Sequence, residues 1–453
     1  MPRRLEDAIA EATLGLDTLW GGDVMNPSGV GRFIADGWFS DEALPRAYTD
    51  PAAARLRETG GASAGTVDRD AIERYLQRVD VRGAIDDVAA AARSMIASVN
   101  AAERLRGRYL EGLAECYAVM WDLAHERLGA VEPVPWERCM QAALGHVPGP
   151  ADPAERRRAV GELLAAAGHP GDLLGAVDRW RRDRLVPAKS IAALGAAFIA
   201  QLDALTVRHV VPFLPSELRD VPRANVRFLP IENAWFSGSM NYLGRARDPD
   251  GQPLYDATYE LNASLSISVP EFVQLVSHEV VPGHVTTFAL LQHLYVLGRV
   301  GFEASVPTMS TRSAVLYEGL ANNAILMAHG VREVHELPDR DLQIGLLLAL
   351  LQDDAKSQSS YLTWKEGVAQ ADVARVLRQD YLVSEERADK LSGAWGRHPL
   401  LGRMYLPAYR AGTEMVAQLR RDHPPERVLP ALFGARGLVD SVTLPALLGG
   451  RLG

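Results

Sequence analysis

The sequence predicts a mostly helical protein that contains one small antiparallel β-sheet. Residues 1–215 are rich in Ala, Leu, Arg and Glu, and their apolar side chains recur at helical spacing. Between residues 223 and 269 the apolar period changes from that of a helix to that of half-buried strands. From residue 311 onward the helical spacing returns. We therefore expect a large helical body with one sheet inserted in its second half.

The first half is expected to be helical throughout. Its clearest helices are predicted at Ala84–Val99, Ala101–Leu128 and Ser190–Val207. Closely spaced prolines at positions 212, 215 and 222 interrupt the pattern, because proline cannot continue a helix. The break suggests an N-terminal helical region at 1–215 and a second region at 216–453.

The sheet is predicted from three segments. Thr258–Val269 alternates almost without fault, and Val226–Ile231 and Trp235–Leu243 are further candidates. Ser268 and Glu271 have the spacing of a capping box, so a helix should begin directly after the last strand. That strand is expected to border any functional side chains on this helix, with one edge free to pair with an extended ligand.

The helix after the last strand carries the most informative residues of the chain. His278-Glu279-Val280-Val281-Pro282-Gly283-His284 places two imidazoles and a carboxylate within seven residues, and Glu318 follows 34 residues after His284. Two neutral histidines and a carboxylate can hold zinc and leave one position open for water. A second carboxylate beside that water can serve as its general base. The helix is otherwise apolar, and burying His278 and Glu279 there costs several kcal/mol unless they are paired or bind metal.

The spacing of the two histidines requires a change in backbone direction. Six residues turn an ideal helix through about 600°, so the two rings would point roughly 120° apart. Pro282 removes one helical hydrogen bond, and Gly283 tolerates almost any conformation. A kink or bulge at this pair is expected to bring His284 back toward His278.

These motifs resemble a family of bacterial metallopeptidase-like proteins, the domain of unknown function 885. The signature of that family is HExxPGHH followed by EGWA, and this chain has HEVVPGH at 278–284 and EGLA at 318–321. Tyr409-Arg410-Ala411-Gly412 is similar to the Y-x-x-G element of the family, and the similarity covers about residues 225–415. The chain departs from the pattern at Val285, where the family has a second histidine, and at Leu320, where it has tryptophan.

The resemblance implies specific roles. It implies one zinc ion held by His278, His284 and Glu318, with Glu279 as the general base. Tyr409, on the Y-x-x-G element, is the preferred donor to the developing oxyanion. The other candidates for contact with substrate are Tyr405, which shares a helical face with Tyr409, Arg403 and His398, which lie nearby in sequence, and Asn262 on the last strand.

Composition narrows the range of partners and compartments. The net charge is −9 with no basic tract, so nucleic acid is not an expected partner. Two cysteines, Cys116 and Cys139, do not suggest a disulfide framework, and we expect a cytoplasmic protein. No run of about 20 apolar residues occurs, so neither a membrane span nor a membrane partner is expected.

The expected function is zinc-dependent hydrolysis of a peptide or amide bond in a small substrate. Two alternatives remain at this level. One keeps zinc but acts on a small-molecule amide of a specialised pathway, which the departures at Val285 and Leu320 favour. The other is a non-haem iron enzyme, because two histidines and one carboxylate also form the iron-binding set of that class. Glu279 argues against iron, since such sites need no neighbouring base.

Overall fold

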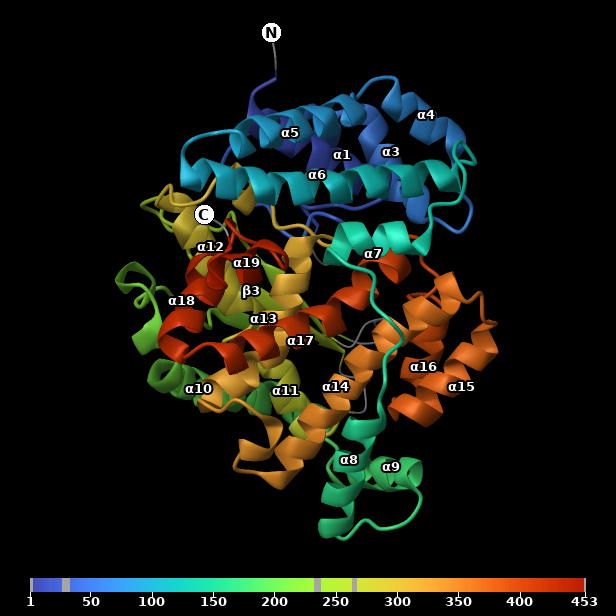
Figure 1. Cartoon of the computed structure of the whole chain (residues 1–453), viewed down its shortest axis with the longest axis vertical. Helices are drawn as coiled ribbons and strands as arrows, with labels where there is room; N and C mark the ends of the chain where they lie inside the picture. The colour runs from blue at the N-terminus through green and yellow to red at the C-terminus, as the bar shows by residue number, and fades with distance from the viewer. Residues whose placement is uncertain (1–2, 27–32, 232–237, 263–266, 452–453) are drawn as a thin grey trace.

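The computed structural model describes residues 3–26, 33–231, 238–262 and 267–451. Helices dominate these residues and one three-stranded sheet accompanies them, which confirms the predicted fold class (Figure 1). The helices form an N-terminal layer above a larger body that contains the sheet. The expected division at residue 215 stays a prediction.

The N-terminal layer is built on two long helices that pack side by side (Figure 1). Four of its helices begin at a side chain that caps the first turn, namely Asp50, Asp68, Asp80 and Asn100. Its helices are α1 (Leu5–Leu19), α2 (Arg46–Thr49), α3 (Pro51–Thr59), α4 (Arg69–Leu76), α5 (Val81–Ile96) and α6 (Ala101–Arg127). The predicted helices at 84–99 and 101–128 correspond to α5 and α6.

Three short helices and one long helix connect this layer to the rest of the chain. They are α7 (Trp136–Leu144), α8 (Ala154–Ala166), α9 (Leu173–Asp183) and α10 (Ile191–His209). By length and composition Ile191–Phe213 is long and apolar enough to cross a membrane, with a mean hydropathy of 1.4 and 22% of its most apolar window buried. Core helices of soluble proteins, which are mostly buried, meet the same criterion; α10 packs against α11 and α13, but most of this window is not buried. The sequence alone predicted no membrane span because α10 contains no uninterrupted run of about 20 apolar residues.

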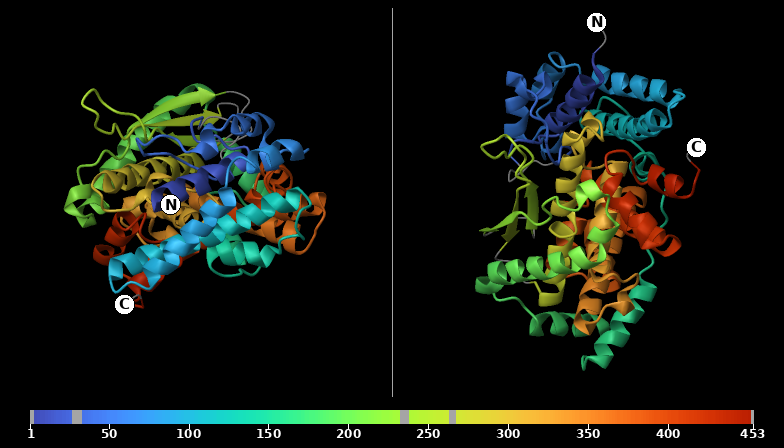
Figure 2. Two further views of the ribbon diagram at one scale, coloured as in Figure 1. Left: turned by 90° about the horizontal axis from the view of Figure 1, so that it is seen from above. Right: turned by 90° about the vertical axis from the view of Figure 1, so that its left-hand side faces the viewer.

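The sheet is mixed and not antiparallel throughout. Its strands are β1 (Val226–Ile231), β2 (Gly238–Tyr242) and β3 (Ala257–Asn262), in the order β1-β3-β2. The central strand β3 runs parallel to β1 and antiparallel to β2. Figure 2 shows the sheet along one side of the molecule, where β1 packs on α10 and β2 on α12.

Nine helices among residues 267–451 complete the body. They are α11 (Val269–Glu279), α12 (His284–Val296), α13 (Arg312–His329), α14 (Arg340–Ser360), α15 (Gln370–Tyr381), α16 (Glu385–Ser392), α17 (Leu406–Asp422), α18 (Pro425–Gly434) and α19 (Thr443–Leu448). One π-helical turn, Tyr361–Lys365, extends α14, and another, Leu401–Tyr405, precedes α17. Helices α11, α13, α14 and α17 pack against one another in the centre of the body, where the candidate site lies.

Candidate metal centre

The HEVVPGH segment forms two helices and not one kinked helix. Helix α11 ends at Glu279, the Val281–Pro282 peptide bond is cis, and α12 begins at His284. His278 therefore lies in the last turn of one helix and His284 at the first position of the next. A Cβ atom on Gly283 would overlap the carbonyl oxygen of His278, so this close return of the chain requires glycine. The predicted reorientation at Pro282-Gly283 occurs, but by a complete break.

The break brings both imidazoles to one carboxylate. The ring centroids of His278 and His284 lie 4.7 Å apart, and their planes are nearly perpendicular. Nε2 of His278 lies 3.4 Å from Oε2 of Glu318, and Nε2 of His284 lies 3.6 Å from Oε1. One ligand atom from each of the three residues lies within 4.8 Å of the others, so the group can hold a metal ion.

Charge and burial both suit a cation at this position. Burial alone would raise the pKa of Glu318, but the two facing imidazoles hold it well below its usual range. Burial lowers the pKa of His278, but the facing Glu318 and the nearby Glu279 raise it overall. Oε2 of Glu318 is buried without a hydrogen-bond donor. A cation among the three side chains gives that oxygen the partner it lacks, so the residues fit a divalent metal.

A contact between two glycines positions Glu318. Gly319 on α13 and Gly412 on α17 touch backbone to backbone, and a Cβ atom on either would overlap a carbonyl oxygen of the other helix. Helices α13 and α17 can therefore cross closely enough for tyrosines on the C-terminal segment to reach Glu318. The glycines of the EGLA and Y-x-x-G motifs thus share one structural purpose.

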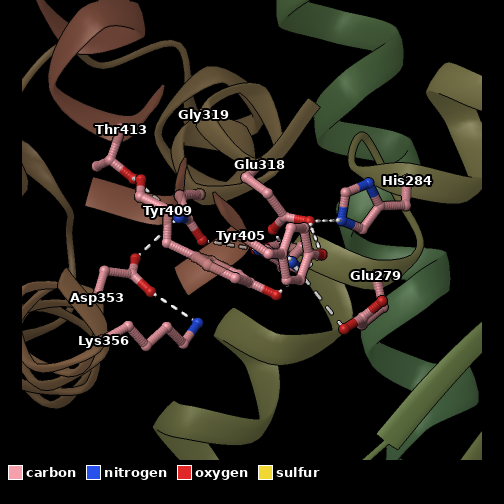
Figure 3. Close-up of polar contacts among 12 residues, drawn as sticks. Glu279, His284, Glu318, Gly319, Asp353, Lys356, Tyr405, Tyr409 and Thr413 are labelled. Carbon is pink, nitrogen blue, oxygen red and sulfur yellow. Dashed lines mark hydrogen bonds and ion pairs between the residues drawn. The ribbon is translucent and has the colours of Figure 1, made fainter. Parts of the chain in front are cut away.

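Two tyrosines continue from the carboxylate in a chain of hydrogen bonds (Figure 3). Tyr405 Oη donates to Oε1 of Glu318 at 2.7 Å, and Tyr409 Oη donates to Tyr405 Oη at 3.2 Å. Burial, and after it the charge of Glu318, raises the pKa of each phenol well above its usual range. Both hydroxyls therefore keep their hydrogen and remain donors. Tyr409 also lies parallel to His278, with ring centroids 6.5 Å apart.

Sequence reasoning missed a group of buried polar residues behind His278. Nδ1 of His278 is hydrogen-bonded to Oδ1 of Asn322 at 2.8 Å, and Nδ2 of Asn322 donates to Asp353 and to Thr413, each at 2.8 Å. Lys356 Nζ donates to Asp353 at 3.0 Å (Figure 3). Asp353 and Lys356, one turn apart on α14, form a buried ion pair. The signal in the sequence was the presence of Asn322, Asp353, Lys356 and Thr413 on helices that also carry many apolar residues.

A cleft opens beside the cluster. It has a volume of about 250 Å³ and is lined by His278, Glu279, Asn322, Lys356 and Tyr409, among others. The Glu279 side chain is 16% exposed, and its Oε1 lies 4.0 Å from Nε2 of His278. Glu279 is therefore close to the three candidate metal ligands and open to the cleft.

The remaining candidate residues occupy other places. Arg403 is buried, and its guanidinium donates to both carboxylate oxygens of Glu126 and to the carbonyls of Val134 and Pro399. Nδ1 of His398 accepts from the backbone N–H groups of Leu400 and Leu401. The pKa of His398 is lowered to about 4, mainly by burial. Neither residue is brought to the cluster. The side chain of Asn262 lies outside the described residues.

The predicted strand Thr258–Val269 has no free edge where it forms β3. Strand β3 is paired on one side with β1 and on the other with β2. Farther along, Ile267 and Val269 exchange backbone hydrogen bonds with Val186 and Arg184. The expectation that an edge is open to a ligand is therefore wrong for β3, while Ile267 and Val269 are paired on one side. The strand does pass near the site. Burial raises the pKa of Tyr259 on β3, and the charge of Glu279 raises it further, so the two side chains lie close enough to interact.

Comparison with known proteins gives a fold but no family. No family model and no curated protein matches the chain. The fold is similar to that of a candidate lipoprotein from Colwellia psychrerythraea, at 12% identity over 84% of this chain and 69% of the other, with a TM-score of 0.53. At this identity the similarity concerns the fold alone.

Two weaker structural similarities involve proteins of different description. A candidate lipoprotein of unknown function from Shewanella oneidensis has 12% identity over 88% of this chain and 78% of its own, with a TM-score of 0.47. Metallocarboxypeptidase 1 of Trypanosoma cruzi has 12% identity over 98% and 95%, with a TM-score of 0.37. Both scores are too low to bear on the function of this chain.

Proposed function

We propose that the chain is a zinc-dependent hydrolase that cleaves a peptide or amide bond in a small substrate. The observation that carries this proposal is the buried grouping of His278, His284 and Glu318 beside a cleft into which Glu279 opens. The motif resemblance to the domain of unknown function 885 supports the same reading of these residues. A cleft of about 250 Å³ suits a short peptide or a small amide.

The donor set favours zinc among the divalent metals. Two imidazoles and one carboxylate leave a fourth position open, which is the pattern of catalytic zinc sites. Zinc held there would polarise the scissile carbonyl and acidify a water molecule. Nε2 is the available donor atom on both histidines, because it is the atom that faces Glu318 in each.

The residues around the metal position divide the remaining work. Glu279 is placed to accept a proton from the attacking water and to pass it to the leaving amine. Tyr409 lines the cleft and keeps its phenolic proton, so it can turn its hydroxyl toward the developing oxyanion. Tyr405 holds the Glu318 carboxylate in place through its hydrogen bond.

Replacement of Glu279 by glutamine separates metal binding from catalysis. We expect Glu279→Gln to retain one zinc ion per chain and to lose roughly 10²–10⁴ in turnover, because only the proton acceptor is removed. Activity is measured on dipeptides, N-acyl amino acids and small amides, and metal by elemental analysis. Glu414→Gln, an exposed carboxylate that pairs with Arg410, is the control. An active Glu279→Gln protein, or a His284→Ala protein with full zinc, would overturn the proposal.

A further inference from the structure

The buried group behind the metal position includes a charged pair that the proposed mechanism does not use. Asn322, Asp353 and Lys356 are 6%, 5% and 7% exposed. Burying a lysine and an aspartate usually stabilises a protein no more than apolar side chains of the same size would. Their hydrogen bonds, however, lead from α14 through Asn322 on α13 to the ring of His278.

Hydrogen-bond polarity fixes the orientation of the Asn322 amide. Thr413 uses its only hydroxyl hydrogen on the carbonyl of Tyr409, at 2.7 Å, so toward Asn322 it can only accept. The Asp353 carboxylate, paired with Lys356, also accepts. Both neighbours therefore require the NH₂ group of Asn322, and the amide oxygen is left to face His278.

The orientation of Asn322 in turn fixes the tautomer of His278. An amide oxygen can only accept, so Nδ1 of His278 must carry a hydrogen. In a neutral ring the lone pair then lies on Nε2, the atom that faces Glu318 at 3.4 Å. A reversed amide would present hydrogens to Nδ1 and leave the ring proton on Nε2, where it blocks metal binding.

Lys356 connects this arrangement with the second functional group of the cleft. Its Nζ lies 3.1 Å from the centroid of the Tyr409 ring while donating to Asp353 at 3.0 Å. A cation over the face of a phenol is attracted by the ring quadrupole. One ammonium group therefore holds the ring of Tyr409 and anchors the carboxylate that orients Asn322 (Figure 3).

We infer that Lys356, Asp353 and Asn322 are positioning residues that set His278 in its metal-binding tautomer and hold Tyr409 beside it. The inference rests on the metal site of the proposed function. It does not require that the protein hydrolyse anything, so zinc affinity and the state of the His278 ring test it independently of activity.

A reciprocal exchange of two side chains tests the polarity argument. In Asp353→Asn, both Asn322 and Lys356 donate toward an amide that has only one oxygen to accept. In Asn322→Asp, two carboxylates face each other. Each single variant should bind zinc about 10–100-fold more weakly in competition with a chelator. The double variant places at position 322 a carboxylate that accepts from His278, and at position 353 an amide that joins this carboxylate to Lys356. Thr413 must then turn its hydroxyl hydrogen from the carbonyl of Tyr409 to the carboxylate, so the double variant should recover much but not all of the affinity. Lys356→Met should also weaken zinc binding.

A neighbouring carboxylate provides the matched control. Asp354 is as buried as Asp353 but pairs with Arg156 and Arg410, so Asp354→Asn should leave zinc affinity unchanged. Single variants with wild-type affinity, or a double variant no better than the singles, would overturn the inference.

Nitrogen-15 spectra of the histidine rings give the second readout. The wild-type protein should show a hydrogen on Nδ1 of His278 with or without zinc, and Asp353→Asn should perturb that resonance. If the wild type binds no zinc, the proposed function fails, while the Nδ1 resonance still decides the tautomer. A neutral His278 ring with its hydrogen on Nε2 would refute the inference.

Discussion

The hydroxyls of Tyr405 and Tyr409 have different partners, and this difference separates their roles. Tyr405 donates to the carboxylate of Glu318, whereas Tyr409 donates to Tyr405 and lines the cleft. The sequence ranked Tyr409 above Tyr405 on motif grounds alone. The structure instead suggests that their loss would be detected by different measurements.

We expect Tyr409→Phe to keep its zinc and to lose roughly 10²–10³ in turnover with little change in KM, because one oxyanion donor is removed. Tyr405→Phe should bind zinc about 10–100-fold more weakly, because Glu318 loses the hydrogen bond that orients it. Steady-state kinetics and chelator competition measure the two effects. Equal zinc affinity in both variants would contradict the division of roles.

At the scale of elements, two close backbone approaches shape the site. Gly283 lets α12 begin directly against the end of α11, and Gly319 with Gly412 lets α13 and α17 cross in contact. The motif glycines therefore act through packing, and they determine where the ligands lie without touching metal or substrate.

Gly412→Ala should destabilise the fold by about 1–3 kcal/mol, because the added methyl group collides with the carbonyl of Val315. It should also weaken zinc binding, since α13 must move and carries Glu318. Denaturant unfolding and chelator competition measure the two effects. Gly161→Ala is the control: its Cβ would come no closer than 3.7 Å to Leu173, and alanine favours a helix by about 1 kcal/mol. Similar losses in both variants would contradict the packing argument.

At the scale of the whole molecule, the metal position joins three helices. His278, His284 and Glu318 come from α11, α12 and α13, so a bound ion links elements that are otherwise held by packing. Zinc at 100 times its Kd should stabilise the folded chain by about 2.7 kcal/mol. Thermal unfolding should therefore occur at a lower temperature after treatment with a chelator. In Glu318→Ala the chelator should have no effect, and a shift there would place the stabilising ion elsewhere.

A buried ion pair fixes the N-terminal layer to the body. Arg106 on α6 donates two hydrogen bonds to Glu303, whose side chain is completely buried. Arg106→Met should destabilise the chain by about 3–5 kcal/mol, because it leaves an unpaired buried carboxylate. Arg82→Met breaks an exposed pair with Asp86 and should cost at most about 1 kcal/mol. Equal effects in denaturant unfolding would contradict this interpretation.

The sequence by itself determined most of the helices and indicated the group of side chains that could hold a metal ion. Periodicity and capping residues are local properties, so α5, α6 and α10 lie within a few residues of their predicted ends. The cost of burying His278 and Glu279 in an apolar helix marked the site before any contact was known. The resemblance then indicated Glu318, which the structure places with the two histidines.

Tertiary structure alone decided which residues support that group. The hydrogen bond from His278 to Asn322 spans 44 positions, and the one from Asn322 to Asp353 spans 31. Strand alternation says which side chains share a face, but the partners of β3 depend on how distant segments fold together, so the open edge was predicted wrongly. Local patterns carry no information about such pairings, because their free energy arises only when packed helices and strands bring the partners together.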